Sequence, residues 1–206
     1  GYERIMEKKN VIFLSVIAVA TLLTAVVGTT FAYFTATVTG NETSKNVNVT
    51  TANMSVVYAQ GSKLSMSNLV PGQPIDPMTF KVTNGGDSAV DYKLAWKDVN
   101  KSWTVESLAT NGKGGLDTDI TYTISACTDE NYTTCNTVVH TATVLPDADG
   151  DITTADTLTL AAGAIAYYKV QVVFTDNKTA AQDALQGQTF GGTVVVSAAV
   201  QSGHLN

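Results

Sequence analysis

The stretch Tyr168-Lys-Val-Gln-Val-Val-Phe174 sets the fold class, because apolar side chains occupy every second position. Successive side chains of a strand point to opposite faces, so this alternation predicts a strand with one buried face. The same period recurs in five other runs, at Met54, Val56 and Tyr58; Met78, Phe80 and Val82; Val90, Tyr92, Leu94 and Trp96; Ile120, Tyr122 and Ile124; and Val194, Val196, Ala198 and Val200.

Residues that favour turns separate these runs. They are Pro71-Gly72, residues 84–87, Asn111-Gly112, Gly114-Gly115, residues 147–151 and Gly191-Gly192. Many short strands with turns between them predict an all-β fold, a two-sheet antiparallel sandwich over residues 33–206. We predict one short helix at 179–186, and no linker divides this region.

The N-terminus has the three parts of a secretory signal. Lys8 and Lys9 precede an uncharged apolar run over residues 11–27, and Thr30-Phe31-Ala32 places small residues where a signal peptidase reads them. This order predicts a signal peptide over 1–32 that is cut before Tyr33. Met6 precedes the lysines and is the more natural start, so we expect residues 1–5 to lie outside the natural protein.

A retained membrane helix is the competing interpretation of the same run. About 20 apolar residues span a bilayer, and residues 11–32 are long enough to do so if they are not cut. The uncleaved signal is the only membrane contact that we expect. The net charge of −6 disfavours nucleic acid as a partner.

The inventory of reactive residues is poor. His140 and His204 are the only histidines, and the chain has neither a His-Glu-x-x-His nor a Gly-x-Ser-x-Gly motif. We therefore expect no enzyme and no cofactor. Trp96, on the same face as Leu94 and Tyr92, and Trp103 are predicted to pack in the core; the alternative is a carbohydrate-stacking platform near Trp103.

Cys127 and Cys135 are the only cysteines, and they lie between two strand-like runs. Opposite each other at the mouth of a hairpin they could form a disulfide, which export would permit; free thiols are the alternative. Asp147, Asp149 and Asp151 alternate like the start of a calcium loop, but Ile152 and Leu158 stand where an EF-hand needs Gly and Glu. We expect a solvated acidic turn there, with a weak calcium site as the alternative.

Several motifs occur in an order that resembles the TasA/camelysin family of exported Gram-positive proteins. Ala32-Tyr33-Phe34 follows the signal, and Asn68-Leu69-Val70-Pro71-Gly72 leads into a strand that ends at Asn84-Gly85. Near the C-terminus, Val172-Val-Phe-Thr-Asp-Asn-Lys178 and Gln186-Gly187 precede a Val-rich strand. The middle, about 95–155, is shorter than in that family and lacks its helical insertions.

The resemblance implies a jelly-roll-like sandwich that a dedicated signal peptidase releases and that polymerises into biofilm-matrix fibres. In such fibres the N-terminal segment of one subunit, here about 33–49, adds as a strand to the next subunit. Tyr33, Phe34, Val38, Val47 and Val49 make this assembly strand prone to β structure, and we predict that it has no hairpin partner of its own. Camelysin is described as a peptidase, but no residues here support that activity.

The expected partners are therefore further copies of the chain, the signal peptidase, and other matrix or cell-wall components. Two other functions stay open at this point. One is a cell-surface adhesin-like module that binds glycan or protein through loops near Trp103. The other is a membrane-anchored or pilin-like subunit that retains its N-terminal helix.

Overall fold

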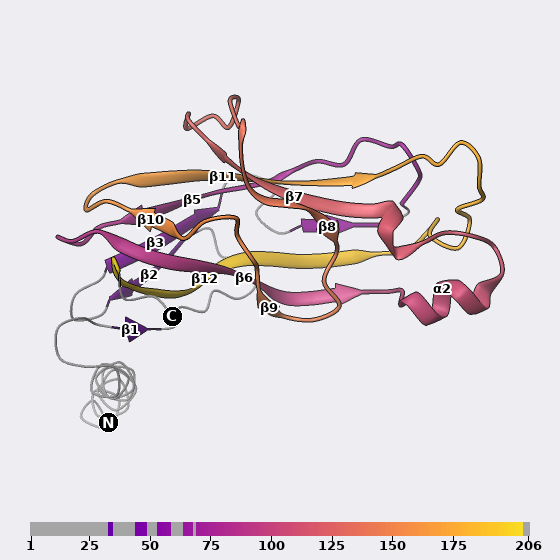
Figure 1. The fold of residues 1–206 in the computed structure, drawn as a ribbon, viewed down its shortest axis with the longest axis horizontal. Coiled ribbons are helices and arrows are strands. Elements are labelled where there is room, and N and C mark those ends of the chain that lie inside the picture. The colour runs from indigo at the N-terminus through magenta and orange to yellow at the C-terminus, as the bar shows by residue number, and fades with distance from the viewer. Residues whose placement is uncertain (1–32, 35–43, 49–52, 59–63, 68, 204–206) are drawn as a thin grey trace, which may run out of the picture.

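A computed structural model describes residues 33–34, 44–48, 53–58, 64–67 and 69–203. Within these residues the strands form two six-stranded sheets, and every strand pair is antiparallel (Figure 1). This architecture confirms the predicted all-β fold with two antiparallel sheets. Each of the six alternating runs lies in a strand.

Sheet A is built around two long neighbouring strands. Its order is β1 (Tyr33–Phe34), β12 (Phe190–Gln201), β6 (Val90–Lys101) and β10 (Leu158–Leu160), with β4 (Leu64–Met66) beside β12 and β9 (Gly150–Asp151) beside β6. Sheet B has the order β2 (Ser44–Asn48), β3 (Asn53–Tyr58), β5 (Met78–Asn84), β11 (Ile165–Phe174), β7 (Ile120–Cys127) and β8 (Thr137–Val144).

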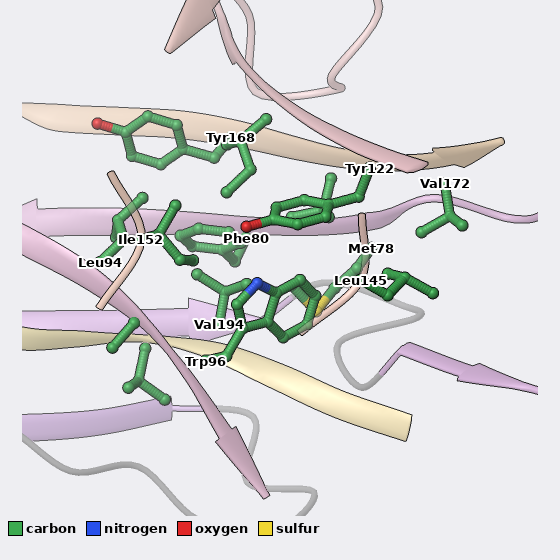
Figure 2. Packing of buried hydrophobic residues seen from close by; sticks show 14 of the residues in the cluster. Met78, Phe80, Leu94, Trp96, Tyr122, Leu145, Ile152, Tyr168, Val172 and Val194 are labelled. Atoms are coloured by element: carbon green, nitrogen blue, oxygen red, sulfur yellow. The ribbon is translucent and has the colours of Figure 1, made fainter. Parts of the chain in front are cut away.

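The core lies between the two sheets and is rich in aromatic contacts. Trp96 of sheet A packs edge-on against Tyr122 of sheet B, with ring centroids 5.2 Å apart (Figure 2). The hydroxyls of Tyr92 and Tyr168 meet across the same interface, and burial raises the pKa of both phenols. The predicted inward positions Tyr92, Leu94 and Trp96 are indeed buried.

The predicted helix is in the wrong place. Residues 179–186 form turns, because the backbone amides of Asp183 and Ala184 donate to the carbonyls of Lys113 and Gly114 instead of to their own segment. Among the described residues an α-helix forms instead at α2 (Val105–Asn111), and the 3-10 turn η1 (Asp117–Asp119) follows it. Thr104 and Ser107 form a reciprocal capping box at its start, and Gly112 ends it in the left-handed conformation.

The predicted turn at Gly191-Gly192 is also wrong, because both glycines lie inside β12. A Cβ atom on Gly192 would lie 3.1 Å from Cε3 of Trp96. The glycine therefore makes room for a core tryptophan in the middle of a strand. The described part of the chain contains no helix of the length and apolarity that a membrane crossing requires, and the apolar run at 11–32 lies outside it.

Candidate functional site

The candidate site is the edge of β12 that faces away from β6. The short strand β1 pairs with one end of this edge, with Tyr33 opposite Val200 and Phe34 opposite Ala199. The short strand β4 pairs with the other end, opposite Phe190, Gly191 and Gly192. Among the described residues, no strand lies beside residues 195–198 on this side of β12. The start of the predicted assembly strand therefore contacts a specific place on sheet A.

β12 is buried like a strand from the middle of a sheet. Only Gly191, Ser197 and Gln201 of its residues are partly exposed, and the others are buried. Neighbouring residues of a strand point to opposite faces, so burial of Val195 and Val196 alike means that both faces of β12 are covered. Because water has little access to such a strand, its backbone N–H and C=O groups are best satisfied when strands pair with both of its edges.

A buried carboxylate holds the end of β12 where β1 docks. Asp91 of β6 lies opposite Val200 and is 5% exposed. Its carboxylate accepts hydrogen bonds from the hydroxyls of Thr159 and Ser202 and from the backbone amide of Gly203, at 2.6, 3.0 and 2.8 Å. These bonds tie β10, β6 and the residues after β12 together, so they fix the end of β12 at which β1 pairs.

The direction of β1 is also defined by its pairing with β12. β1 runs antiparallel to β12, so the chain passes from Val200 to Ala199 and heads towards the middle of β12. A longer strand that kept this register would lie along residues 195–198. Two residues of pairing thus define both the edge and the polarity of the N-terminal segment.

The predicted assembly strand is not one strand in this structure. Tyr33 and Phe34 belong to β1 in sheet A, whereas Val47 belongs to β2 in sheet B, opposite Met54 of β3. The prediction that the segment has no hairpin partner is therefore wrong for 44–48. The β2–β3 pairing closes at Asn48 and Asn53, so the short connection makes local pairing inexpensive in entropy. Thr30, Ala32, Val38 and Val49 lie outside the described residues.

The chain matches no protein-family model and no curated protein sequence. The resemblance to the TasA/camelysin family consequently rests on the sequence motifs alone.

Two of those motifs lie at the two ends of β5. Gly72 has a φ of 74°, and its amide donates to the carbonyl of Phe174, which fixes the turn before β5. Asn84 at the end of β5 is fully buried and donates through Nδ2 to the carbonyls of Ser88 and Leu160. Both motifs therefore have a structural role. The first fixes the chain before β5 against the end of β11, and the second fixes the end of β5 against β10.

The cysteines and the loop between them belong to sheet B rather than to β12. Cys127 and Cys135 form a disulfide at the mouth of the β7–β8 hairpin. Within that loop Asp129 accepts hydrogen bonds from the Thr133 hydroxyl and from the amides of Thr133 and Thr134, which lower the pKa of its carboxyl to about 2. Tyr132 packs edge-on against Tyr167 of β11. The loop is therefore held at both its base and its tip.

The three alternating aspartates point to three different partners. Asp147 pairs with Lys101, Asp149 pairs with Lys97 and accepts from the amide of Val99, and Asp151 accepts from the hydroxyl of Ser197. Within the residues that the structure describes, no group of three acidic, histidine or cysteine side chains is arranged to hold a metal.

Two aromatic side chains are held inside the fold. Trp103 is 1% exposed, which confirms the predicted core packing and makes the alternative of a carbohydrate-stacking platform near it wrong. His140 stacks on Tyr122 with ring centroids 4.6 Å apart, and its Nδ1 lies 2.6 Å from the carbonyl oxygen of Thr153. His204 lies outside the described residues.

Sequence reasoning missed β12 as the acceptor of the N-terminal segment. The sequence feature that could have indicated β12 is Thr193-Val-Val-Val-Ser-Ala-Ala-Val200, in which apolar residues follow one another directly instead of only alternating with polar ones. A continuous apolar run indicates a strand that is buried on both faces, and the alternating interpretation overlooked this. The role of Asp91 had no comparable signal, because its partners are far away in the sequence.

Proposed function

We propose that the chain is a secreted, non-catalytic structural subunit with a jelly-roll-like sandwich that polymerises into extracellular fibres. A signal peptidase removes 1–32, and the freed N-terminal segment of one subunit pairs with β12 of the next. The pairing of Tyr33 and Phe34 with Val200 and Ala199 carries this proposal, because it identifies the edge that accepts the segment. Main-chain bonds give such strand addition its affinity.

The same contact explains how a subunit can exist before it assembles. Within one chain, β1 covers the end of its own β12. In a fibre, the equivalent segment of a neighbour takes that place, which is an exchange of identical elements between subunits. Because the two pairings use the same residues, exchange costs little beyond the freedom lost on association.

The buried aromatic and histidine side chains support a role without catalysis. His140 is 9% exposed and stacked against Tyr122, so its ring belongs to the core rather than to an open cleft. A general base must reach the proton that it abstracts from a substrate. The sequence motifs that resemble the TasA/camelysin family support the same proposal.

Electron microscopy of the mature chain beginning at Tyr33 tests the proposal. We expect filaments, and we expect deletion of 33–49 to abolish them. The matched control is Val138→Thr, a change on an exposed position of β8 that leaves the N-terminal segment intact. Mature protein that stays monomeric in every condition would contradict the proposal, and mass spectrometry of the exported chain reports whether the cut precedes Tyr33.

A further inference from the structure

A buried lysine lies between two aspartates at the end of the sandwich that carries α2. Lys101 is the last residue of β6, and its side chain is only 2% exposed. Its Nζ lies 3.1 Å from Oδ1 of Asp117 and 2.5 Å from Oδ1 of Asp147, and 3.5 Å from the carbonyl oxygen of Leu145. The Trp103 ring lies beside it, with its centroid 5.2 Å from Nζ. A primary amine is thus held, away from solvent, against a carboxyl group.

The carboxyl group of Asp117 is held as firmly as the amine. Asp117 begins η1, and its side chain is 14% exposed. Its Oδ1 also accepts a hydrogen bond of 2.8 Å from the indole Nε1 of Trp103, which is itself buried. A donor aimed at this oxygen draws electrons away from the carboxyl carbon and stabilises negative charge that develops on Oδ1.

We propose that Lys101 and Asp117 join in an intramolecular amide bond. The amine and the carboxyl group react in their neutral forms, and the transfer of one proton from Nζ to the Asp117 carboxylate within the ion pair supplies both. The lone pair of Nζ attacks Cγ of Asp117 and forms the new C–N bond, while Trp103 stabilises the oxyanion on Oδ1. Holding the two groups in contact supplies the proximity that the reaction needs.

Asp147 completes the proton balance of this step. Its carboxylate accepts one proton from Nζ and returns that proton to the departing Oδ2 hydroxyl of Asp117, so the C–O bond breaks and one water leaves. The second Nζ proton remains on the amide nitrogen. The reaction consumes no oxidant, reductant or cofactor, and it exchanges a buried ion pair for a neutral amide.

The bond would join the two sheets. Lys101 ends β6 of sheet A, and η1 leads directly into β7 of sheet B. The other end of β7 carries Cys127, whose disulfide with Cys135 closes the β7–β8 hairpin. Covalent links would therefore hold β7 at both of its ends, one to the neighbouring sheet and one to the neighbouring strand.

β6 also provides a matched control. Lys97 lies 3.6 Å from Asp149, but the two side chains are 32% and 43% exposed. The pKa of Asp149 is lowered, chiefly by the hydrogen bond from the amide of Val99, so this carboxylate stays ionised. Water and charge both oppose amide formation there, and we expect the Lys97–Asp149 pair to remain an ordinary ion pair.

Mass spectrometry of the purified full-length mature chain tests the proposal. After denaturation and reduction of the disulfide, the intact mass should be lower than the sequence mass by one water. Trypsin should fail to cut after Lys101 and should yield one branched peptide that joins residues 98–113 to residues 114–169. Separate peptides 98–101 and 102–113 at full mass would overturn the proposal, and so would a water loss that maps to any other residue.

Three variants make the result specific. Lys101→Arg should abolish the mass deficit, whereas Lys97→Arg should retain it. Asp117→Asn should lose ammonia instead of water, since an amide side chain releases a different leaving group. Asp147→Asn should slow the reaction of freshly refolded protein; a rate equal to that of the unmodified chain would remove Asp147 from the mechanism and overturn that part of the proposal.

Discussion

Strand β8 is an outer strand of sheet B, whereas β12 lies inside sheet A and has only the short strands β1 and β4 on one side, and the two strands differ in burial and in polarity. β8 exposes Thr137, Val138, Thr141, Ala142 and Thr143 and buries only His140. Its edge is partly covered from within the chain, because the amide of Ala155 donates to the carbonyl of Val139. β12 is buried on both faces and receives the N-terminal strand β1. A polar, partly covered edge resists further pairing, whereas a buried apolar strand favours it.

The largest expected effect is on filaments and comes from proline substitutions in β12 and in β8. Ser197 and Thr141 each lie at an irregularity and have no register partner on the inner strand, β6 or β7. Proline removes a backbone donor but disturbs the inner ladder least at such positions. By electron microscopy we expect Ser197→Pro to abolish filaments and Thr141→Pro to leave them intact. The opposite pattern would move the acceptor edge to sheet B.

The next largest effect is on the free energy of unfolding and comes from removing the disulfide at the base of the β7–β8 loop. Replacing Cys127 and Cys135 with serine opens the loop at 128–134, and loss of a native disulfide costs about 2–4 kcal/mol. Urea unfolding should show this loss, while filaments should still form below the unfolding midpoint because β12 is unchanged. Filaments that disappear although the subunit remains folded would show that β8 takes part in assembly.

A smaller stability effect is expected at Gly192 of β12. The added methyl of Gly192→Ala would lie 3.1 Å from the Trp96 ring, and overpacking of this kind costs about 1–3 kcal/mol. Gly150→Ala in β9 is the control, since no atom lies within 4 Å of the added carbon and its φ is not in the positive range. Equal unfolding midpoints in urea for the two variants would mean that Trp96 does not constrain β12.

The smallest effect depends on pH and is confined to the loop before β8. Hydrogen bonds lower the pKa of Asp129 to about 2, below the value of about 4 that it has when unfolded. The hydrogen bonds to the ionised carboxylate therefore stabilise the folded state fully above pH ~4. This stabilisation is lost as the pH falls through ~2 and the carboxylate is protonated. NMR titration of the Asp129 carboxyl should give the low midpoint, and Thr133→Ala should raise it. An ordinary midpoint in the unmodified chain would show that the loop is not fixed by Asp129.

The alternation of apolar residues was sufficient to predict six of the strands (β3, β5, β6, β7, β11 and β12), because one buried face leaves a period of two in the sequence. It was insufficient for Gly192, since the reason for a glycine inside a strand is the ring of Trp96, which is distant along the chain. The helix was misplaced for a related reason. The backbone amides of Asp183 and Ala184 donate to the carbonyls of Lys113 and Gly114, and only the folded chain brings these segments together.

The site was harder to predict than the fold. The segment 33–49 contains several β-prone residues, but propensity does not reveal that Tyr33 pairs with β12 while Val47 pairs within a hairpin. The cluster of Lys101, Asp117 and Asp147 depends on contacts between residues that are 16 or more positions apart. Interactions of that range leave no local pattern in a single sequence.

Cross-linking between two different subunits tests strand addition to β12 most directly. One variant carries Phe34→Cys and the other Ala199→Cys, positions that are register partners in β1 and β12. Antiparallel partners are close enough for a disulfide, so oxidised filaments grown from a mixture of the two should contain covalent dimers. A mixture of Phe34→Cys with Thr141→Cys in β8 should contain none. Mixed filaments without dimers between positions 34 and 199, or with dimers to position 141 instead, would contradict the account.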